Sequence, residues 1–353
     1  MIVDSTPAAA DSSAIRFRDP QIEMAHGAGG KLSRRLIEGL IAPAFANAVL
    51  QPLADSALFD LQGTRVATTA DAYVVKPLRF NGGSIGELAI NGTVNDLAVA
   101  GAHPVGLMAT FILEAGLTNA VLRAEVEAMA LAARRAGVAI FGGDTKVVEH
   151  GMADGMYIST FGIGRVDPRA NLGPQRVRPG DAVLLSGPIG DHGITILLAR
   201  GELELETDLA SDTRPVTAFV GALLDSAAEG LHWMRDPTRG GVATALNELA
   251  RDASCGVILD EESIPLRNEV RGACEILGLD PLHIANEGQL IAIVADEFAE
   301  DALAAMRAVP GGEAAARIGE IQSEPSKTVL CVNGYGGTRV VDMLVGDPLP
   351  RIC

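Results

Sequence analysis

Five aspartates beside glycine-rich segments are the first indication of chemistry in this chain. They are Asp55, Asp71, Asp96, Asp144 and Asp236, and most stand where a strand is expected to end or a helix to begin. Such positions combine carboxylates with free backbone N–H groups, as a magnesium-bound nucleotide requires. Taken singly, each aspartate is better explained as a helix cap or a turn residue. Five in similar surroundings favour a metal and phosphate site.

Two glycine pairs are candidate phosphate-binding segments. Residues 26–31 read His-Gly-Ala-Gly-Gly-Lys, with Gly29 and Gly30 before the lysine. This is neither a Walker A motif, because a leucine follows the lysine, nor the Rossmann glycine pattern. A flexible surface turn explains it equally well. The second pair, Gly240 and Gly241, stands at an expected helix start, where N–H groups are free to bind phosphate.

Three further residues are candidates for catalysis. Cys353 is the last residue printed, and two prolines before it favour an extended tail that can reach roughly 25 Å. Arg351 is expected on the same side of that tail, where it would favour the thiolate. The alternative is a frayed end with an incidental thiol. Lys146 and Glu287 lie in expected loops and are either catalytic or surface ion-pair partners.

The composition argues against several classes of protein. A net charge of −17 over 353 residues opposes binding along a nucleic acid or an anionic membrane surface. No apolar run approaches the ~20 residues of a membrane span. The four cysteines form no C-x-x-C pair, so they indicate a reducing, cytoplasmic setting rather than a disulfide framework or a zinc site.

Helical and strand patterns alternate along the chain, which predicts an α/β or α+β fold in two domains. A helix is expected through residues 119–135, because Thr118 or the next residue can cap it and Gly137 can end it. A short strand over residues 138–141 should then give way to a loop over 142–146.

Other elements should position the remaining aspartates. Residues 66–69 read as a strand that ends near Asp71, and residues 85–100 as a helix that carries Asn95 and Asp96. A break rich in proline and glycine follows over residues 167–180. We therefore divide the chain into a disordered leader over residues 1–24, an N-terminal domain over 25–170, a C-terminal domain over 171–345 and a mobile tail over 346–353.

Eight segments, in order along the chain, carry a resemblance to a known family. They are Ala25–Gly30, Asp71–Val75, Gly92–Ala98, Phe111–Glu114, Gly143–Val148, Gly190–Gly193, Asp236–Val242 and Ala285–Gly288, and the chain then closes on Pro350–Cys353. In these segments the chain resembles the HypE family of hydrogenase maturation proteins, in the AIR synthetase (PurM-like) superfamily. The resemblance extends from about His26 to the last residue.

The resemblance implies a homodimer in which the N-terminal domains pair into a β-barrel and ATP binds near the interface. It also implies that HypF transfers a carbamoyl group to the C-terminal cysteine. An ATP-dependent dehydration would then convert the thiocarboxamide to a thiocyanate. The cyano group would pass to iron held by a HypC–HypD complex, on its way to a [NiFe] hydrogenase.

With that reaction in view, each candidate residue receives an expected role. Magnesium and ATP are expected at Asp55, Asp71, Asp96 and Asp144, supported by Asn95 and Thr145, with Gly29 and Gly30 over the phosphates. Asp236 and the N–H groups of Gly240 and Gly241 would hold phosphate. Cys353 would carry the group, Lys146 would stabilise the phosphorylated oxygen, and Glu287 would act as base.

Two other functions remain open from the sequence. A sister enzyme that phosphorylates an amide or similar acceptor, such as AIR synthetase or thiamine-phosphate kinase, shares the motifs but gives no reason for the terminal Pro-Arg-Ile-Cys. Selenophosphate synthetase is disfavoured, because its nucleophilic cysteine or selenocysteine lies near the N-terminal glycine loop, and in this chain no cysteine precedes Cys255. An ATP-binding scaffold without catalysis, whose tail docks a partner, is the third possibility.

Overall fold

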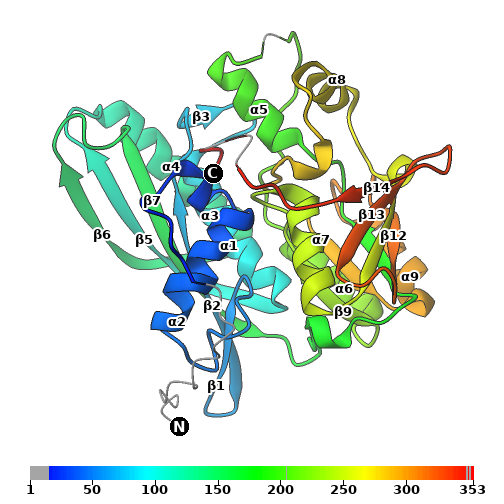
Figure 1. The fold of residues 1–353 in the computed structure, drawn as a ribbon. Helices are drawn as coiled ribbons and strands as arrows, with labels where there is room; N and C mark the ends of the chain where they lie inside the picture. The colour runs from blue at the N-terminus through cyan, green and yellow to red at the C-terminus, as the bar shows by residue number, and fades with distance from the viewer. Residues whose placement is uncertain (1–15, 204, 347–348, 350) are drawn as a thin grey trace.

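Two β-sheets, one from each half of the chain, organise the protein (Figure 1). The computed structural model describes residues 16–203, 205–346, 349 and 351–353. The five-stranded N-terminal sheet has the order β1-β2-β7-β5-β6. Its strands are β1 (Ala57–Leu61), β2 (Thr64–Tyr73), β5 (Ala102–Glu114), β6 (Ala139–Val148) and β7 (Met156–Val166). The predicted mixed α/β fold is confirmed.

One face of the N-terminal sheet is covered by helices. Helix α3 (Ile85–Val99) packs on β2, β5 and β7, and α4 (Asn119–Ala136) packs on α3. All but two residues of α3 are buried, so the whole helix is part of the core. A two-stranded ribbon, β3 (Arg79–Phe80) and β4 (Gly83–Ser84), leads into it. The opposite face of the sheet stays open.

The sequence predicted α4 correctly but misjudged two strands. The Thr118 hydroxyl accepts a hydrogen bond from Val121 N–H, and Gly137 ends the helix with φ +69°. The loop expected over residues 142–146 is wrong, because β6 continues through them to Val148, paired in parallel with β5. Asp71 likewise lies within β2 and not at its end. Sheet pairing gives each of these backbone groups a partner and overrides the local turn signals.

The C-terminal sheet has seven strands in the order β14-β13-β10-β12-β8-β11-β9. They are β8 (Ala182–Leu185), β9 (Leu231–Arg235), β10 (Gly256–Asp260), β11 (Ile291–Val294), β12 (Ala316–Gln322), β13 (Thr328–Val332) and β14 (Thr338–Val341). Its helices are α5 (Asp191–Arg200), α6 (Thr217–Ala227), α7 (Gly241–Asp252), α8 (Asn268–Leu277) and α9 (Asp296–Ala308). Short turns η3 (Pro174–Arg176), η4 (Glu261–Ser263) and η5 (Pro281–His283) connect them.

The two halves share a hydrophobic core. Ile85 and Leu88 of α3 belong to the same buried cluster as Ile194 of α5, and Leu349 and Ile352 join it from the end of the chain. After β14 the chain crosses back from the C-terminal sheet toward the N-terminal half, where the C-terminus lies (Figure 1). The tail therefore completes the packing between the domains.

The first described residues are held against the helices that follow them. Of the predicted leader, residues 1–15 fall outside the described part. The Asp19 carboxylate binds both His26 and Arg35, which anchors the next segment to η1 (Met24–Gly27) and α1 (Lys31–Leu36). The π-helix η2 (Ile37–Ile41) and α2 (Ala42–Ala44) follow. Among the described residues, no helix is long and apolar enough to span a membrane.

Candidate active site

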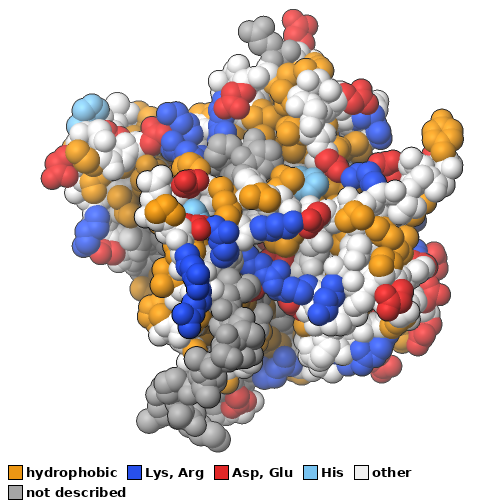
Figure 2. All heavy atoms as spheres, in the orientation of Figure 1, with side chains coloured by type: hydrophobic (Ala, Val, Ile, Leu, Met, Phe, Trp, Pro, Cys, Tyr) orange, Lys and Arg blue, Asp and Glu red, His pale blue; other side chains and the backbone are white. Residues whose placement is uncertain are grey.

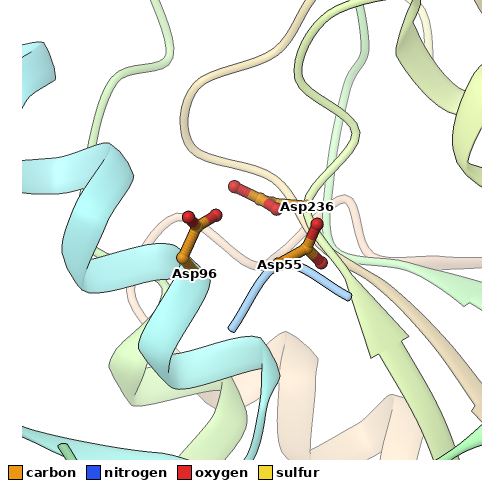
Figure 3. Close-up of side chains that lie close together, drawn as sticks. All are labelled: Asp55, Asp96 and Asp236. Atoms are coloured by element: carbon orange, nitrogen blue, oxygen red, sulfur yellow. The ribbon is translucent and has the colours of Figure 1, made fainter. Parts of the chain in front are cut away.

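Three carboxylates meet where the two domains face each other (Figure 3). Asp55 precedes β1, Asp96 lies near the end of α3, and Asp236 directly follows β9. One oxygen from each lies within 4.8 Å of the others. The sequence predicted Asp55 and Asp96 as metal ligands, whereas it assigned Asp236 to phosphate. The geometry groups all three.

Burial and mutual repulsion dominate the electrostatics of this cluster. Loss of solvent raises the pKa of Asp236 to about 8, with the Asp55 charge adding to the shift. The pKa of Asp96 lies well above its ordinary value because of burial and the charges of Asp71 and Asp236. Burial also raises the pKa of Asp55, although Arg235 opposes the change. Carboxylates so crowded suit a divalent cation, which relieves the repulsion.

Polar neighbours hold the three carboxylates in place. Thr69 donates a hydrogen bond of 2.7 Å to Asp96, and Arg235 pairs with Asp55 and Glu248, each at 2.9 Å. Burial opposes the charge on Arg235, yet these carboxylates hold its pKa above the ordinary value. Arg235, from the C-terminal domain, is therefore a positive charge that stays next to the carboxylate cluster.

The carboxylate cluster opens into a pocket of about 370 Å³. Asp71 lines this pocket together with the cluster residues Asp55 and Asp96. Arg34 and Arg251 line its other side, and Figure 2 shows Lys and Arg side chains gathered in the middle of this face. A chain of net charge −17 thus carries a local basic rim beside buried carboxylates. That combination suits a polyphosphate held with a divalent cation.

The glycine loop before α1 is packed, so the surface-turn alternative does not apply. Gly29 has φ +78°, and a Cβ on it would lie 2.9 Å from the Cβ of Arg239. Its N–H donates to the Ser33 hydroxyl at 2.8 Å. A Cβ on Gly30 would lie 2.4 Å from the Leu344 carbonyl oxygen. The loop closes one side of the pocket against the C-terminal domain.

The second glycine pair stands at the start of α7, as predicted. Gly240 is the residue before the helix and Gly241 is its first residue. The Gly241 N–H already donates to the Thr238 carbonyl at 2.9 Å. Thr238 and Thr244 line the pocket, so their side chains face it where the sequence had placed the glycine amides.

Glu287 is buried beside the pocket, and hydrogen bonds to Asp212 hold its backbone. Asp212 accepts hydrogen bonds from the Glu287 and Gly288 N–H groups at 3.0 and 3.2 Å. Burial and the charges of Asp212 and Asp236 raise the pKa of Glu287 well above its ordinary value. Its Oε1 is buried without a hydrogen-bond partner among the described residues. An unsatisfied buried carboxyl oxygen is costly, which indicates that Glu287 awaits a ligand.

Asn95 connects helix α3 to the C-terminal domain through hydrogen bonds. Its amide nitrogen donates to the carbonyls of Arg214 and Glu287, and its oxygen accepts the Val216 N–H at 2.8 Å. These bonds tie α3 to two loops of the C-terminal domain. The side chain supports the site through the Glu287 backbone.

Cys353 lies half-buried in a docked tail. The Val74 N–H donates to a main-chain carboxylate oxygen of Cys353 at 3.0 Å. The expectation that Arg351 follows an extended backbone beside the thiol is wrong, because its φ is +58° and its guanidinium pairs with Asp154 at 2.7 Å. Arg239 is the cation that responds to the end of the chain, since the charge of Cys353 is the largest cause that raises the Arg239 pKa. Arg239 is also influenced by Glu287 and so links the tail to the pocket.

Three predicted residues lie apart from the carboxylate cluster within this chain. Asp144, Thr145 and Lys146 are on β6, at the edge of the N-terminal sheet. Lys146 binds Asp144 at 2.8 Å, with 68% of the lysine side chain exposed. This hydrogen bond holds the pKa of Asp144 below its usual value. The structure gives Lys146 no contact with Cys353.

Sequence reasoning missed Arg235 and Arg239. Both flank Asp236 in one strand-to-helix segment that was read for its carboxylate and glycines. Arg235 is the last residue of β9, where a side chain at the strand end points toward the pocket region. The signal available in the sequence was the alternation of charged and small residues after a buried strand. The neighbouring sequence does not indicate which carboxylate or other charged group lies near each arginine.

Comparisons with known proteins agree with this geometry. Residues 53–166 match the model of the AIR synthase related protein N-terminal domain, and residues 178–332 match its C-terminal domain. The carbamoyl dehydratase HypE of Azotobacter vinelandii is 50% identical over 97% of this chain and 100% of that protein. A crystal structure of HypE in complex with ATP is 45% identical, with a TM-score of 0.79 over 94% of this chain and 99% of that one.

A solved complex of HypE with HypF gives a similar result. Its matching chain is 43% identical, with a TM-score of 0.83 over 88% of this chain and 99% of that one. Identity at this level, over nearly the whole length of each relative, extends well beyond a shared fold. The chain belongs to the HypE family of carbamoyl dehydratases, among the AIR synthase related proteins.

Proposed function

We propose that this protein uses ATP to dehydrate a carbamoyl group carried on the Cys353 thiol. The product would be a thiocyanate, the source of a cyanide ligand for the iron of a [NiFe] hydrogenase. The observation that carries the proposal is the position of Arg239. Arg239 lines the pocket and donates to the Gly27 carbonyl. The charges of Cys353, Asp71 and Glu287 all raise its pKa, so the tail, the pocket and the candidate base act on one side chain.

The reaction balances as a phosphorylation followed by an elimination. The amide oxygen of the thiocarboxamide attacks the γ-phosphorus of ATP and releases ADP. The nitrogen then loses its two protons as the C–O bond breaks, which forms the C≡N bond and releases phosphate. Oxygen thus leaves as phosphate and not as hydroxide, a much poorer leaving group. The carbon–sulfur bond to Cys353 stays intact throughout.

Glu287 is the residue we assign to removal of the nitrogen protons. Its unpartnered Oε1 is a free acceptor among the described residues. Its pKa is raised by burial and by the charges of Asp212, Asp236 and Asp71. Neutralisation of the charges of Asp236 and Asp71 in the loaded site would lower that pKa, so that Glu287 is ionised near neutral pH and able to accept a proton.

The carboxylate cluster is where we place the divalent cation. Asp55, Asp96 and Asp236 would hold magnesium, with Asp71 beside them, and the ion when bound would offset the charge of the phosphates. The residues fit such an ion because the three carboxylates, one buried and two half-buried, repel one another without it. Arg34, Arg251 and the glycine loop would face the phosphates.

A homodimer formed through the open face of the N-terminal sheet accounts for Lys146 and Asp144. Exposed apolar side chains cover that face, among them Met108 and Phe161, which pair directly across β5 and β7, and Phe141 on β6. The same strand β6 carries Asp144, Thr145 and Lys146. A second copy packed there would bury the apolar face and bring these polar residues toward a shared nucleotide site.

The partners proposed for this chain follow from the reaction. HypF, which forms a complex with a HypE relative, would donate the carbamoyl group. A HypC–HypD complex would accept the cyano group, and both steps would take place in the cytoplasm. The tail must leave its docked position for each transfer, because Ile352 is buried between the domains.

Intact-mass measurement tests the proposed reaction. With HypF, carbamoyl phosphate and ATP, the wild-type protein should gain one carbamoyl group and then lose one water. Cys353→Ala should gain nothing. Glu287→Gln should hold the carbamoyl group without losing water, while the exposed control Glu297→Gln should behave like wild type.

Two results would contradict the proposal. Modification of Cys353→Ala would show that the tail thiol does not carry the group. A carbamoylated wild-type protein that never loses water in the presence of ATP would indicate a scaffold and not a dehydratase.

A further inference from the structure

The Gly190–Gly193 turn belongs to neither the carboxylate cluster nor the pocket described above. Asp191 begins α5 and binds Arg267 at 2.8 Å. His192 follows, fully buried in the interface between the domains. A buried histidine is usually a satisfied core residue, so its partners decide whether it has another role.

One partner of His192 is the tail itself. Its Nε2 lies 2.7 Å from the Ile352 carbonyl oxygen. Among the described residues, the other polar contact of this ring joins Nδ1 to the Ser211 hydroxyl at 2.8 Å. Ser211 accepts the Thr213 N–H at 3.2 Å, so its own proton is free to point at Nδ1. Nδ1 is then the acceptor, and Nε2 carries the hydrogen that it donates to Ile352.

The ring stays neutral in this position. Burial lowers the pKa of His192 to about 4, against the opposing effect of the Ile352 carbonyl. Phe80 packs its ring edge-on against the imidazole at 5.5 Å. The hydrogen bond to the tail is therefore a neutral donor to a carbonyl throughout the physiological pH range.

Gly193 forms the apolar part of the same surface. A Cβ at Gly193 would lie 3.1 Å from Cδ1 of Leu349 and 2.5 Å from Cγ2 of Ile284. Glycine thus leaves the space that the Leu349 side chain fills. Leu349 is 3% exposed and Ile352 is 5% exposed, so both tail side chains are buried here.

Backbone pairing completes the contact on the other side of the tail. The N–H groups of Val74 and Lys76 donate to a main-chain carboxylate oxygen of Cys353 and to the Arg351 carbonyl, at 3.0 and 3.3 Å. The tail therefore runs antiparallel to residues 74–76, although neither segment forms a regular strand. Such pairing holds any sequence, whereas His192 and Gly193 fix the register of this one.

We propose that the Gly190–Gly193 turn is the receptor for the C-terminal tail, and that His192 is a positioning residue whose Nε2–H fixes the Ile352 carbonyl and so places Cys353. The consequence for dehydration rests on the proposed function; the docking does not. Ser211 orients His192, and the adjacent Asp212 holds the Glu287 backbone. One loop thus aligns the docked tail with the candidate base.

Thiol labelling tests the docking without any chemistry of the tail cargo. The other cysteines, Cys255, Cys274 and Cys331, are buried, so a maleimide should react first at Cys353, with the site confirmed by peptide mass mapping. His192→Leu should raise the labelling rate at Cys353 by about fivefold to tenfold, the factor expected for loss of one hydrogen bond. His192→Gln keeps an N–H donor at the end of the side chain and should restore protection.

Two further variants keep the test decisive. The control is His103→Leu. His103 lies at the start of β5, and its half-exposed ring pairs with Asp167, so this variant should label like wild type. If His192→Leu does not fold, Ser211→Ala keeps the ring but removes its orienting partner, and labelling should rise by about twofold to threefold. Wild-type rates in a folded His192→Leu, or in Ser211→Ala where it is the only folded variant, would overturn the proposal.

Single-turnover kinetics separate a positioning role from a general structural one. In His192→Leu the carbamoyl group should load at the wild-type rate or faster, while dehydration slows about fivefold to tenfold and ATP affinity stays unchanged. An equal loss of loading rate, dehydration rate and ATP affinity would show that His192 has only a structural role in the core, and would overturn the inference. If the wild type never dehydrates, the proposed function fails, and the labelling result still decides the docking.

Discussion

At the scale of single residues, the carboxylate cluster is defined by its need for a counter-charge. Asp96 receives one hydrogen bond from Thr69, and Asp55 has one arginine, Arg235. Asp236 nevertheless has its pKa raised to about 8. A carboxyl group whose pKa is higher in the folded than in the unfolded state binds more protons when folded. Its ionisation therefore lowers stability as pH rises between the two values.

Magnesium should stabilise the protein in a pH-dependent manner. The ion binds ionised carboxylates, and protons compete with it below the raised pKa of Asp236. We expect millimolar magnesium to raise the melting temperature by roughly 3 °C at about pH 8, and by under about 1 °C near pH 5. Differential scanning fluorimetry measures this. Asp96→Asn should abolish the gain; an equal gain at both pH values would contradict a site at this cluster.

Some of these residues could be predicted from the sequence and some could not. Asp55 and Asp96 could be predicted because five aspartates stand in similar surroundings, although each taken singly is better explained as a cap or turn residue. The grouping of Asp236 with them depends on how the two domains meet, which no local pattern records. For the same reason Arg239 was overlooked, since Cys353, whose charge has the largest effect on the Arg239 pKa, is far away in the sequence.

At the scale of elements, β6 is unusual for a strand. It carries Phe141 and Val147, 60% and 66% exposed, on an edge that pairs only with β5 in the described residues. An exposed apolar edge favours association with another chain. The sequence indicated the first residues of this strand through their apolar run. It missed the continuation through Gly142–Lys146, because glycine and aspartate favour turns unless a neighbouring strand pairs with them.

Phe141→Glu should disrupt the proposed homodimer. A buried, unpaired charge at the centre of an apolar interface costs several kcal/mol, enough to lower the association constant by roughly 100-fold or more. Analytical ultracentrifugation should then report half the wild-type mass. The control is Tyr335→Glu, an aromatic that is fully exposed in the β13–β14 turn, which should leave the mass unchanged. An unaltered dimer in Phe141→Glu would place the interface elsewhere.

At the scale of the whole molecule, the docked tail packs against the core but contributes little to its net stability. Leu349 and Ile352 pack between the domains, and full burial of each contributes ~1.5–3 kcal/mol. The backbone hydrogen bonds from Val74 and Lys76 add to this gain, and the conformational entropy lost on ordering the tail backbone offsets much of it. The small net gain allows the tail to dock and to leave.

Removal of residues 346–353 should therefore change stability little. We expect a fall in melting temperature of about 1–3 °C, with ATP affinity near that of the full chain. Calorimetry of both proteins measures the two quantities. A fall of more than about 10 °C would show instead that the tail is essential to the packing between the domains.

The tethering of the tail also determines how the reaction depends on concentration. A short linker holds its end group near the dock at an effective concentration of order millimolar, whatever the amount of protein in solution. The affinity of the dock for the free terminal sequence can therefore be weak, and release correspondingly fast. Dehydration should follow first-order kinetics in loaded protein, and a free peptide with the sequence of the last residues should compete only when it approaches that same millimolar range.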